Sequence, residues 1–317
     1  MFWTFLQTSI RFSTVFMYGV TGETITEKSG HLNLGIPGIM CIGAIGGALG
    51  ESVYLKSLND ISNISGFGAI MVPILFTLLF AGLAGLLFSF FTVTLRCNQN
   101  VTGLTITTFG VGFFGFMKNR IDQTGFNVAK QFFIKGIASA DSGWFQQMFL
   151  SYGVLVYLAI AIAIIVAIVI KRTRTGLNLR AVGENPATAD AMGISVTKYR
   201  YISTILGSAI AGLGGLFYIM DYSGSIPEVA VDSYGWLAVA LVIFTVWKPN
   251  WGILGSILFG ALLTAPNFIN VSSYNKEILK LIPYVVTVLV LIVTSIVNKR
   301  ETQPPAALGV SYFREER

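Results

Sequence analysis

Charged residues are scarce in this sequence. Only 11% of its 317 residues are Asp, Glu, Lys or Arg, whereas 54% are hydrophobic, and a typical globular chain carries about 25% charged residues. So few charges cannot form the surface of a water-soluble protein, and the composition therefore excludes a soluble enzyme, a disordered chain and a collagen-like chain. The composition is that of an integral membrane protein.

Cysteine and histidine are also nearly absent. Cys41 and Cys97 lie in or beside apolar stretches, which gives no basis for a disulfide framework and predicts two buried thiols. The single histidine, His31, has no cysteine or carboxylate pair near it, so we expect a loop residue and no metal site. The net charge of +6 does not indicate a nucleic-acid partner, because cytoplasmic loops of membrane proteins collect Lys and Arg.

Long charge-free runs predict the fold class. A spanning helix needs about 20 mostly apolar residues, and these runs are too long and too apolar for the strands of a membrane barrel. A further span is expected near 10–27, with residues 1–9 lying at the membrane surface. The prediction is an all-α, polytopic bundle of about nine transmembrane helices, with eight to ten as the range. The charge-free runs are 32–50, 61–95, 97–117, 142–170, 201–220, 233–247, 249–275 and 281–298.

The distribution of charge orients this bundle. Loop 171–200 carries an excess of Lys and Arg, which predicts a cytoplasmic position, and 221–232 contains acidic residues only, which predicts an external one. Alternation then puts the N-terminus outside and the C-terminus in the cytoplasm. We expect residues 1–300 to form a single transmembrane domain and 301–317 to form a cytoplasmic tail.

The cytoplasmic loop contains signals for a short helix. Asn185 can cap its start, Pro186 suits the first helical position, and Gly193 suits the residue after its end. These signals predict a helix from Pro186 to Met192. A small, partly apolar helix on the surface suits docking into a groove of a partner protein, although an ordinary connector between spans carries the same signals.

Two separated motifs resemble a known family. The run RAVGENP from Arg180 to Pro186, followed by Ala187, Ala191 and Gly193, resembles the coupling-loop signature of permease subunits in ABC importers of the branched-chain amino acid, ribose and nucleoside group. The run SGHLNLGIPGIM, residues 29–40, resembles the element that follows the first span in that group. The similarity covers roughly residues 10–300 and is closest to the basic-membrane-protein type of nucleoside permease, where Glu more often stands in place of Pro37.

The resemblance implies a set of partners in the cell membrane. The loop helix would insert into a cleft of an ATP-binding subunit, and a paralogous second permease subunit and an extracytoplasmic substrate-binding lipoprotein would complete the importer. By position, the coupling role falls to Arg180, Glu184, Asn185, Pro186, Ala191 and Gly193.

Uncharged polar residues are candidates for the substrate pathway. Asn100, Thr105 and Thr108 are expected near one side of a helix, and Asn33 with Gly35 belongs to a segment whose broken backbone would be tolerated beside a cavity. Among the aromatic residues, Phe114 is a candidate for contact with a base. Hydrogen bonding between helices explains such polar residues as well. These groups suit a neutral cargo: a nucleoside first, then riboflavin or a simple sugar, then branched-chain amino acids.

The sequence holds no sign of chemistry in the chain itself. No P-loop occurs, so ATP and Mg²⁺ are expected in the partner subunit, with no cofactor and no catalytic site here. The pattern formed by Gly110, Gly112 and Gly115 resembles a dinucleotide motif but lies inside a span, without the required strand. An ion-coupled secondary transporter is the alternative of a different class, and it would place ionisable residues at mid-membrane, where the charge-free runs have none.

Overall fold

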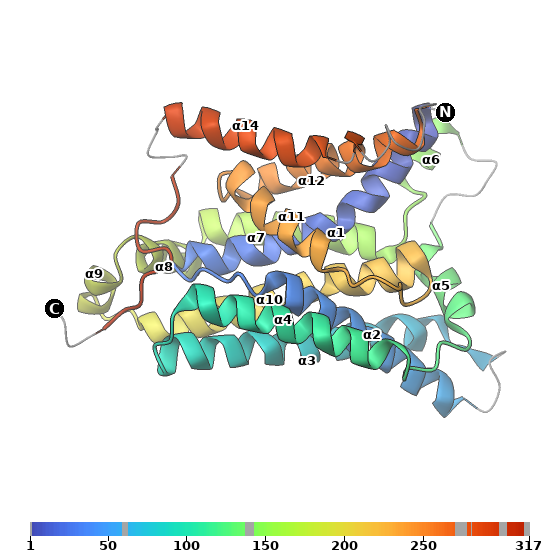
Figure 1. Ribbon diagram of the computed structural model, residues 1–317, viewed down its shortest axis with the longest axis horizontal. Helices are drawn as coiled ribbons and strands as arrows, with labels where there is room; N and C mark the ends of the chain where they lie inside the picture. The colour runs from blue at the N-terminus through green and yellow to red at the C-terminus, as the bar shows by residue number, and fades with distance from the viewer. Residues whose placement is uncertain are drawn as a thin grey trace.

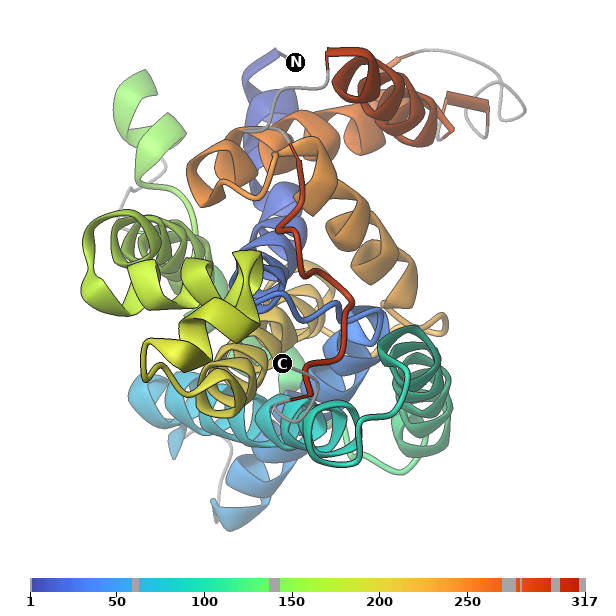
Figure 2. The same cartoon turned by 90° about the vertical axis from the view of Figure 1, so that its left-hand side faces the viewer.

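The chain folds into a bundle of helices. The computed structural model describes residues 2–58, 63–136, 143–269, 278–279, 281–297 and 303–313, and these residues contain no strand. The long helices lie side by side along the long axis of the molecule in Figure 1, and Figure 2 looks along that axis. The all-α prediction is confirmed. The helices are α1 (Phe2–Lys28), α2 (Ile36–Ser57), α3 (Gly66–Ser89), α4 (Gln99–Lys118), α5 (Phe126–Ile134), α6 (Trp144–Phe149), α7 (Val154–Arg172), α8 (Arg174–Glu184), α9 (Pro186–Ala191), α10 (Val196–Phe217), α11 (Asp232–Phe244), α12 (Pro249–Thr264) and α14 (Ile282–Val297).

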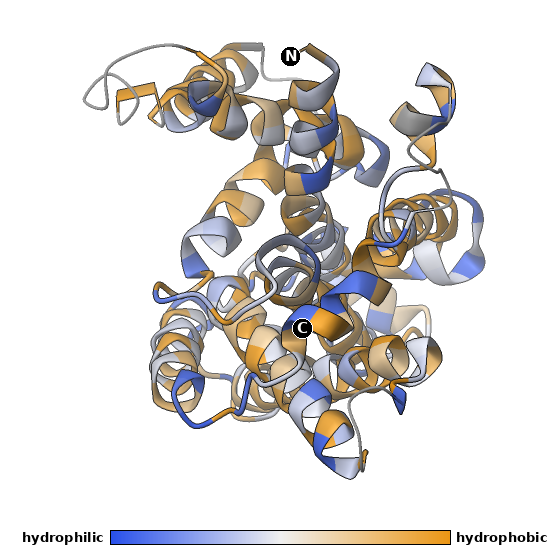
Figure 3. Cartoon of the chain, turned by 90° about the vertical axis from the view of Figure 1, so that its right-hand side faces the viewer, coloured by the Kyte–Doolittle hydropathy of each residue, from blue (hydrophilic) through white to orange (hydrophobic). Residues whose placement is uncertain are grey.

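Within the described ranges, five helical stretches are long and apolar enough to cross a membrane. These are α2, α3, α4, α7 and α10, with α3 prolonged to Thr94 and α10 prolonged to Ser223 by π-helical turns. Of the remaining helices, α11 has 13 residues and α12 and α14 have 16 each. Large hydrophobic side chains are exposed along several of the helices, and Figure 3 shows apolar residues along much of their length. Such surfaces suit contact with lipid chains.

Some expected boundaries were wrong. Residues 1–9 do not form a separate surface piece, because α1 runs unbroken from Phe2 and this stretch contains no Pro or Gly to interrupt it. The run 142–170 is divided between the short helix α6 and the long helix α7. Cys41 is buried as expected, but Cys97 is exposed, because it lies in the turn between α3 and α4.

Two helices continue beyond the charge-free runs 32–50 and 201–220. Each of them includes the acidic residue that follows the run, and that residue is buried. Glu51, in α2, is fully buried, and neither of its carboxylate oxygens has a hydrogen-bond partner among the described residues. Asp221, in the π-helical extension of α10, is fully buried and forms an ion pair with Arg11 of α1 at 2.9 Å. The runs themselves are free of charge, but the helices that contain them are not.

Helix α10 packs against α1, α2 and α3. Its small residues permit the close approach: Gly207 lies against Gly22 of α1, and Gly212 against Gly43 of α2. Helices α2 and α4 meet in the same way, because a Cβ added to Gly110 would overlap the backbone of Gly38. Backbones that touch this closely gain van der Waals contact that lipid cannot replace.

The contact between α2 and α4 makes a prediction about stability. Gly110→Ala should lower the midpoint of thermal unfolding in detergent micelles, because the added methyl group has no room and overpacking costs about 1–3 kcal/mol. Gly112→Ala is the matched control, since a Cβ there meets no atom within 4 Å. Equal effects of the two substitutions on the midpoint would contradict this packing.

Candidate coupling surface and translocation pathway

The segment 29–35 joins α1 to α2 without forming a helix, and most of it is buried. Buried backbone groups need hydrogen-bond partners, and side chains from two neighbouring helices supply them. The Leu32 N–H donates to Gln99 Oε1 of α4 at 2.8 Å, and the Asn33 N–H donates to Glu23 Oε1 of α1 at 3.1 Å. The Thr107 hydroxyl of α4 donates to the Leu34 carbonyl at 2.8 Å. The loop is therefore part of the protein core.

His31 lies in this loop, as predicted, but it is fully buried. Its Nε2 lies 2.8 Å from Thr92 Oγ1 and its Nδ1 lies 2.7 Å from Thr204 Oγ1. Since the Thr92 hydroxyl donates to the Phe88 carbonyl, it must accept from Nε2–H, which leaves Nδ1 to accept from Thr204. Burial, with a smaller effect of the Arg200 charge, lowers the pKa of His31 to about 3. A neutral imidazole therefore joins α10 to the end of α3.

Asn33 and Gly35 have structural roles in the loop. Asn33 is fully buried, and its Oδ1 accepts a hydrogen bond from the Gly35 N–H at 2.9 Å just before α2 begins. Its Nδ2 has no partner among the described residues. Phe114 is only 1% exposed and belongs to the hydrophobic core. These three pathway candidates lie on the inner side of α4.

The other three pathway candidates lie on the outer side of α4. Asn100, Thr105 and Thr108 are exposed. The hydroxyls of Thr105 and Thr108 donate to carbonyls of their own helix, to Val101 O at 2.8 Å and to Leu104 O at 3.0 Å. Further along the helix, Gly112 and Gly115 face open space. The structure thus separates the six candidates into an inner and an outer group and does not bring them together in one cavity.

The coupling loop forms the helix that its sequence predicts. Helix α9 covers Pro186–Ala191, and Asn185 Oδ1 caps it by accepting from the Thr188 N–H at 3.0 Å. Gly193 follows with a φ of +81°, a left-handed conformation that suits glycine. The helix ends one residue before the predicted Met192, which is 78% exposed. Of the predicted coupling residues, Arg180, Glu184, Asn185, Ala191 and Gly193 are exposed and Pro186 is partly exposed.

Gly183 packs the loop 171–200 against the end of α1. A side chain there would overlap the Lys28 carbonyl at the end of α1, so α8 and α1 touch through their backbones. The Gly183 carbonyl also accepts a hydrogen bond from the Ala307 N–H at 2.9 Å. Residue 183 belongs to the predicted motif, but its contact with α1 is not predictable from the motif, because Gly183 and Lys28 are far apart in the sequence.

The C-terminal segment 303–313 lies across the same end of the bundle (Figure 2). The Gly309 N–H donates to the Gly30 carbonyl at 3.2 Å, and the Tyr312 hydroxyl donates to Asp190 Oδ2 of α9 at 2.8 Å. Arg96 stacks on Phe313, with its Cζ 4.8 Å from the ring centroid. This part of the tail is therefore packed against the loop 29–35 and helix α9.

The opposite end of the bundle holds exposed ion pairs. Lys118 Nζ at the end of α4 lies 2.9 Å from Glu228 Oε2, and this hydrogen bond and charge lower the pKa of Glu228. The pKa of Asp122 is lowered mainly by hydrogen bonds from Thr124. Both carboxylates are therefore charged at neutral pH.

Comparison with known proteins identifies the family. Residues 5–291 match the family described as the permease component of branched-chain amino acid transport systems. The chain is 31% identical to the putative glucose ABC transporter permease protein TsgC13 of Haloferax volcanii, over 98% of this chain and 97% of that protein. It is 30% identical to the nucleoside ABC transporter permease protein NupC of Lactococcus lactis, over 96% and 95% of the two chains, and 29% identical to the guanosine ABC transporter permease protein NupQ of Bacillus subtilis, over 93% and 92%.

No solved structure matches this chain. An ion-coupled secondary transporter, the alternative from the sequence, belongs to a different class from the family that matches. The apolar helices agree with a multi-pass protein of the cell membrane. The chain belongs to the family of branched-chain amino acid transport permease components and is a permease subunit of an ABC importer.

Proposed function

We propose that this permease carries a small, neutral, hydrogen-bonding solute, with a nucleoside as the first choice. The observation that carries the proposal is the outer face of α4, where Thr105, Thr108, Gly112 and Gly115 are open and uncharged. Lipid favours large apolar side chains, whereas small and polar residues suit a helix that faces a polar path or another helix. Two relatives named as nucleoside and guanosine permeases support the nucleoside, and one named as a glucose permease supports a simple sugar as the alternative. Riboflavin and branched-chain amino acids are the next candidates for the transported solute.

A second permease subunit would complete the path. We infer that its surface lies opposite the outer face of α4, so that the two subunits enclose the solute between them. Large exposed side chains flank the small residues, with Leu104 at 47%, Phe109 at 63% and Phe116 at 54% exposed. Aromatic groups of this kind suit contact with a partner helix and with a nucleobase. The resemblance to the importer family implies that the second permease subunit is a paralogue of this chain. The two subunits would then form a heterodimer.

The coupling helix α9 is the proposed docking element for an ATP-binding subunit. Arg180, Glu184 and Asn185 are exposed beside it, and its connection through Gly183 to the end of α1 would transmit movement to the bundle. ATP, Mg²⁺ and the hydrolytic residues would belong to that subunit, so that this chain needs no cofactor and no catalytic site. An extracytoplasmic binding lipoprotein would deliver the solute at the opposite end.

We propose about nine spans, with the N-terminus outside and the C-terminus in the cytoplasm. Figure 1 supports this arrangement, since α8, α9 and the tail lie at one end and the start of α1 lies at the other. Helix α1 would span despite its charges, because Glu23 and Glu27 are buried in protein and not exposed to lipid. Helices α11, α12 and α14 would complete the count, residues 1–300 would form one membrane domain, and 301–317 would be the cytoplasmic tail.

Cysteine labelling tests this orientation. In a version with Cys41→Ala and Cys97→Ser, a cysteine at Asn185 should stay unlabelled by a membrane-impermeant thiol reagent in intact cells, while a cysteine at Ser225 should react. Both positions are exposed, so accessibility within the protein does not decide the result. The reverse pattern, labelling at 185 and not at 225, would invert the proposed topology.

Two substitutions test the coupling helix. Glu184→Arg and Gly193→Trp should reduce uptake at least tenfold and separate it from ATP hydrolysis. The first reverses a charge beside α9, and the second places a large side chain on the left-handed backbone that follows α9. Membrane insertion should be unchanged. Glu184→Asp is a matched control, because it keeps the charge at the same exposed position. Normal uptake by both coupling variants would remove the docking role of α9.

Substitution on the outer face of α4 tests the pathway. Thr105→Leu and Asn100→Leu should lower uptake several-fold without lowering assembly with the ATP-binding subunit, because they remove hydrogen-bonding groups from an open surface. Thr4→Leu, at an exposed position in the first turn of α1, is the control. If these residues only held helices together, uptake and assembly would fall together. Transport of a multiply charged solute that ignores both substitutions would place the path elsewhere.

A further inference from the structure

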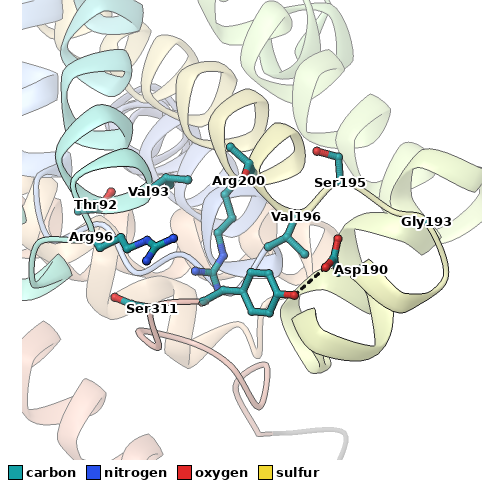
Figure 4. A pocket seen from close by; sticks show the side chains of 11 residues that line it. Thr92, Val93, Arg96, Asp190, Gly193, Ser195, Val196, Arg200 and Ser311 are labelled. Carbon is teal, nitrogen blue, oxygen red and sulfur yellow. Dashed lines mark hydrogen bonds between the residues drawn. The ribbon is translucent and has the colours of Figure 1, made fainter. Parts of the chain in front are cut away.

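A polar cavity lies between the end of α3, the start of α10 and the C-terminal segment. Its volume is about 370 Å³. Figure 4 shows that two arginines from different elements, Arg96 and Arg200, point into it. Its lining also includes the acidic residue Asp190 of α9. The lining residues are Thr92, Val93, Arg96, Asp190, Gly193, Ser195, Val196, Thr197, Arg200, Ser311 and Tyr312.

Arg200 is the unusual member of this lining. The residue is only 3% exposed, and its Nε and Nη2 have no hydrogen-bond acceptor in the part of the chain that the structure describes. Burying a charged group is costly unless hydrogen bonds and an opposite charge compensate it. No described acidic residue forms an ion pair with Arg200. Two nitrogens of the Arg200 guanidinium therefore lack an acceptor, and the adjoining cavity has room for a ligand that would supply one.

Arg96 adds a second guanidinium to the same space. Its backbone has a φ of +59°, a left-handed conformation that is uncommon for residues other than glycine. Its side chain points toward the cavity in Figure 4. Arg96 packs on the ring of Phe313, and it forms no ion pair with a described residue. Strain of this kind is concentrated at functional sites.

The acidic group in the lining does not neutralise both cations. Asp190 Oδ2 accepts the hydroxyl of Tyr312, which turns this oxygen toward the tail. With Asp190 charged, two guanidiniums and one carboxylate leave the lining with a net positive charge. Ser311 and Thr197 contribute further hydroxyl groups.

We propose that this cavity binds a phosphate group, presented either by a soluble phosphate ester or by the headgroup of an anionic phospholipid. Guanidinium groups pair with phosphate oxygens through paired, charge-assisted hydrogen bonds, which makes two arginines around one cavity suited to a tetrahedral oxyanion. A cavity of this size is in the range of small-ligand sites, which begins at about 300 Å³. The site is separate from the outer face of α4, so it does not depend on which solute is carried.

Binding of inorganic phosphate to the full-length chain in maltoside micelles tests the proposal. Phosphate should raise the midpoint of thermal unfolding saturably and broaden its own phosphorus NMR signal. Arg96→Asn should weaken this binding at least tenfold and still fold, because Arg96 is exposed and Asn tolerates a left-handed backbone. Arg200→Gln should do the same, with Arg200→Lys as the variant that keeps the charge. Arg174→Gln, an exposed arginine outside the cavity, is the control and should bind as the original chain does.

A second arm separates the two sources of phosphate. The same chains are reconstituted in phosphatidylcholine nanodiscs with and without phosphatidic acid, and bound lipid is measured by native mass spectrometry. Retention of phosphatidic acid that both Arg96→Asn and Arg200→Gln abolish assigns the site to a headgroup, whereas an effect of inorganic phosphate alone assigns it to a soluble ester. Absence of both effects in the original chain, or equal binding by all variants, overturns the proposal.

The last residues of the chain provide a further check. Glu315 and Glu316 follow Phe313 closely in the sequence, and their carboxylates are an alternative partner for the arginines. A chain that ends at Phe313 should bind phosphate at least as well as the full chain. Binding that occurs only after this truncation would overturn the proposal, because it would assign the guanidiniums to the tail.

Discussion

The structure depends on the need to satisfy the buried backbone of residues 29–35. Each polar group left unpaired in such a place costs about 1–3 kcal/mol, and a segment without helical hydrogen bonds has several of them. Gln99 and Thr107 of α4 and Glu23 of α1 supply partners. Because these partners come from different helices, the loop fixes the positions of α1, α2 and α4 relative to one another. The side of α4 that faces the loop is thereby determined, and so is the side that remains open.

The same loop connects the bundle to α8 and α9, the proposed coupling elements. Gly30 accepts a hydrogen bond from Gly309 of the tail, and Gly183 touches the end of α1 immediately before the loop. His31 extends the connection to α10 and to the end of α3. A displacement of α9 would therefore act on a rigid junction of several helices. Helices whose backbones are in contact can shift little relative to one another, since closely packed elements have few alternative arrangements.

Local sequence signals predict an element correctly where residues close together in the sequence determine its structure. The helix at Pro186 was predicted because a cap, a first-turn proline and a left-handed glycine act within a few residues of each other. The burial of His31 was not predicted, because its partners Thr92 and Thr204 are far away in the sequence. Glu51 and Asp221 were missed for another reason: a search for charge-free runs ends a helix at its first charge, whereas a protein interior can enclose that charge. The pathway candidates in α4 were chosen for their side-chain chemistry, but which of them are buried and which are exposed is set by packing against α2.

The chemistry of the outer face of α4 would suit the proposed path of the solute. The hydroxyls of Thr105 and Thr108 already donate to their own helix, so removing a solute leaves no donor unpaired. Their oxygens retain lone pairs that can accept a hydrogen bond from a solute. Such groups would bind a solute weakly and release it readily, because the hydroxyls of Thr105 and Thr108 stay paired within the helix whether or not a solute is present. A permease needs a path with this property, since a site that held the solute tightly at any depth would stop its passage.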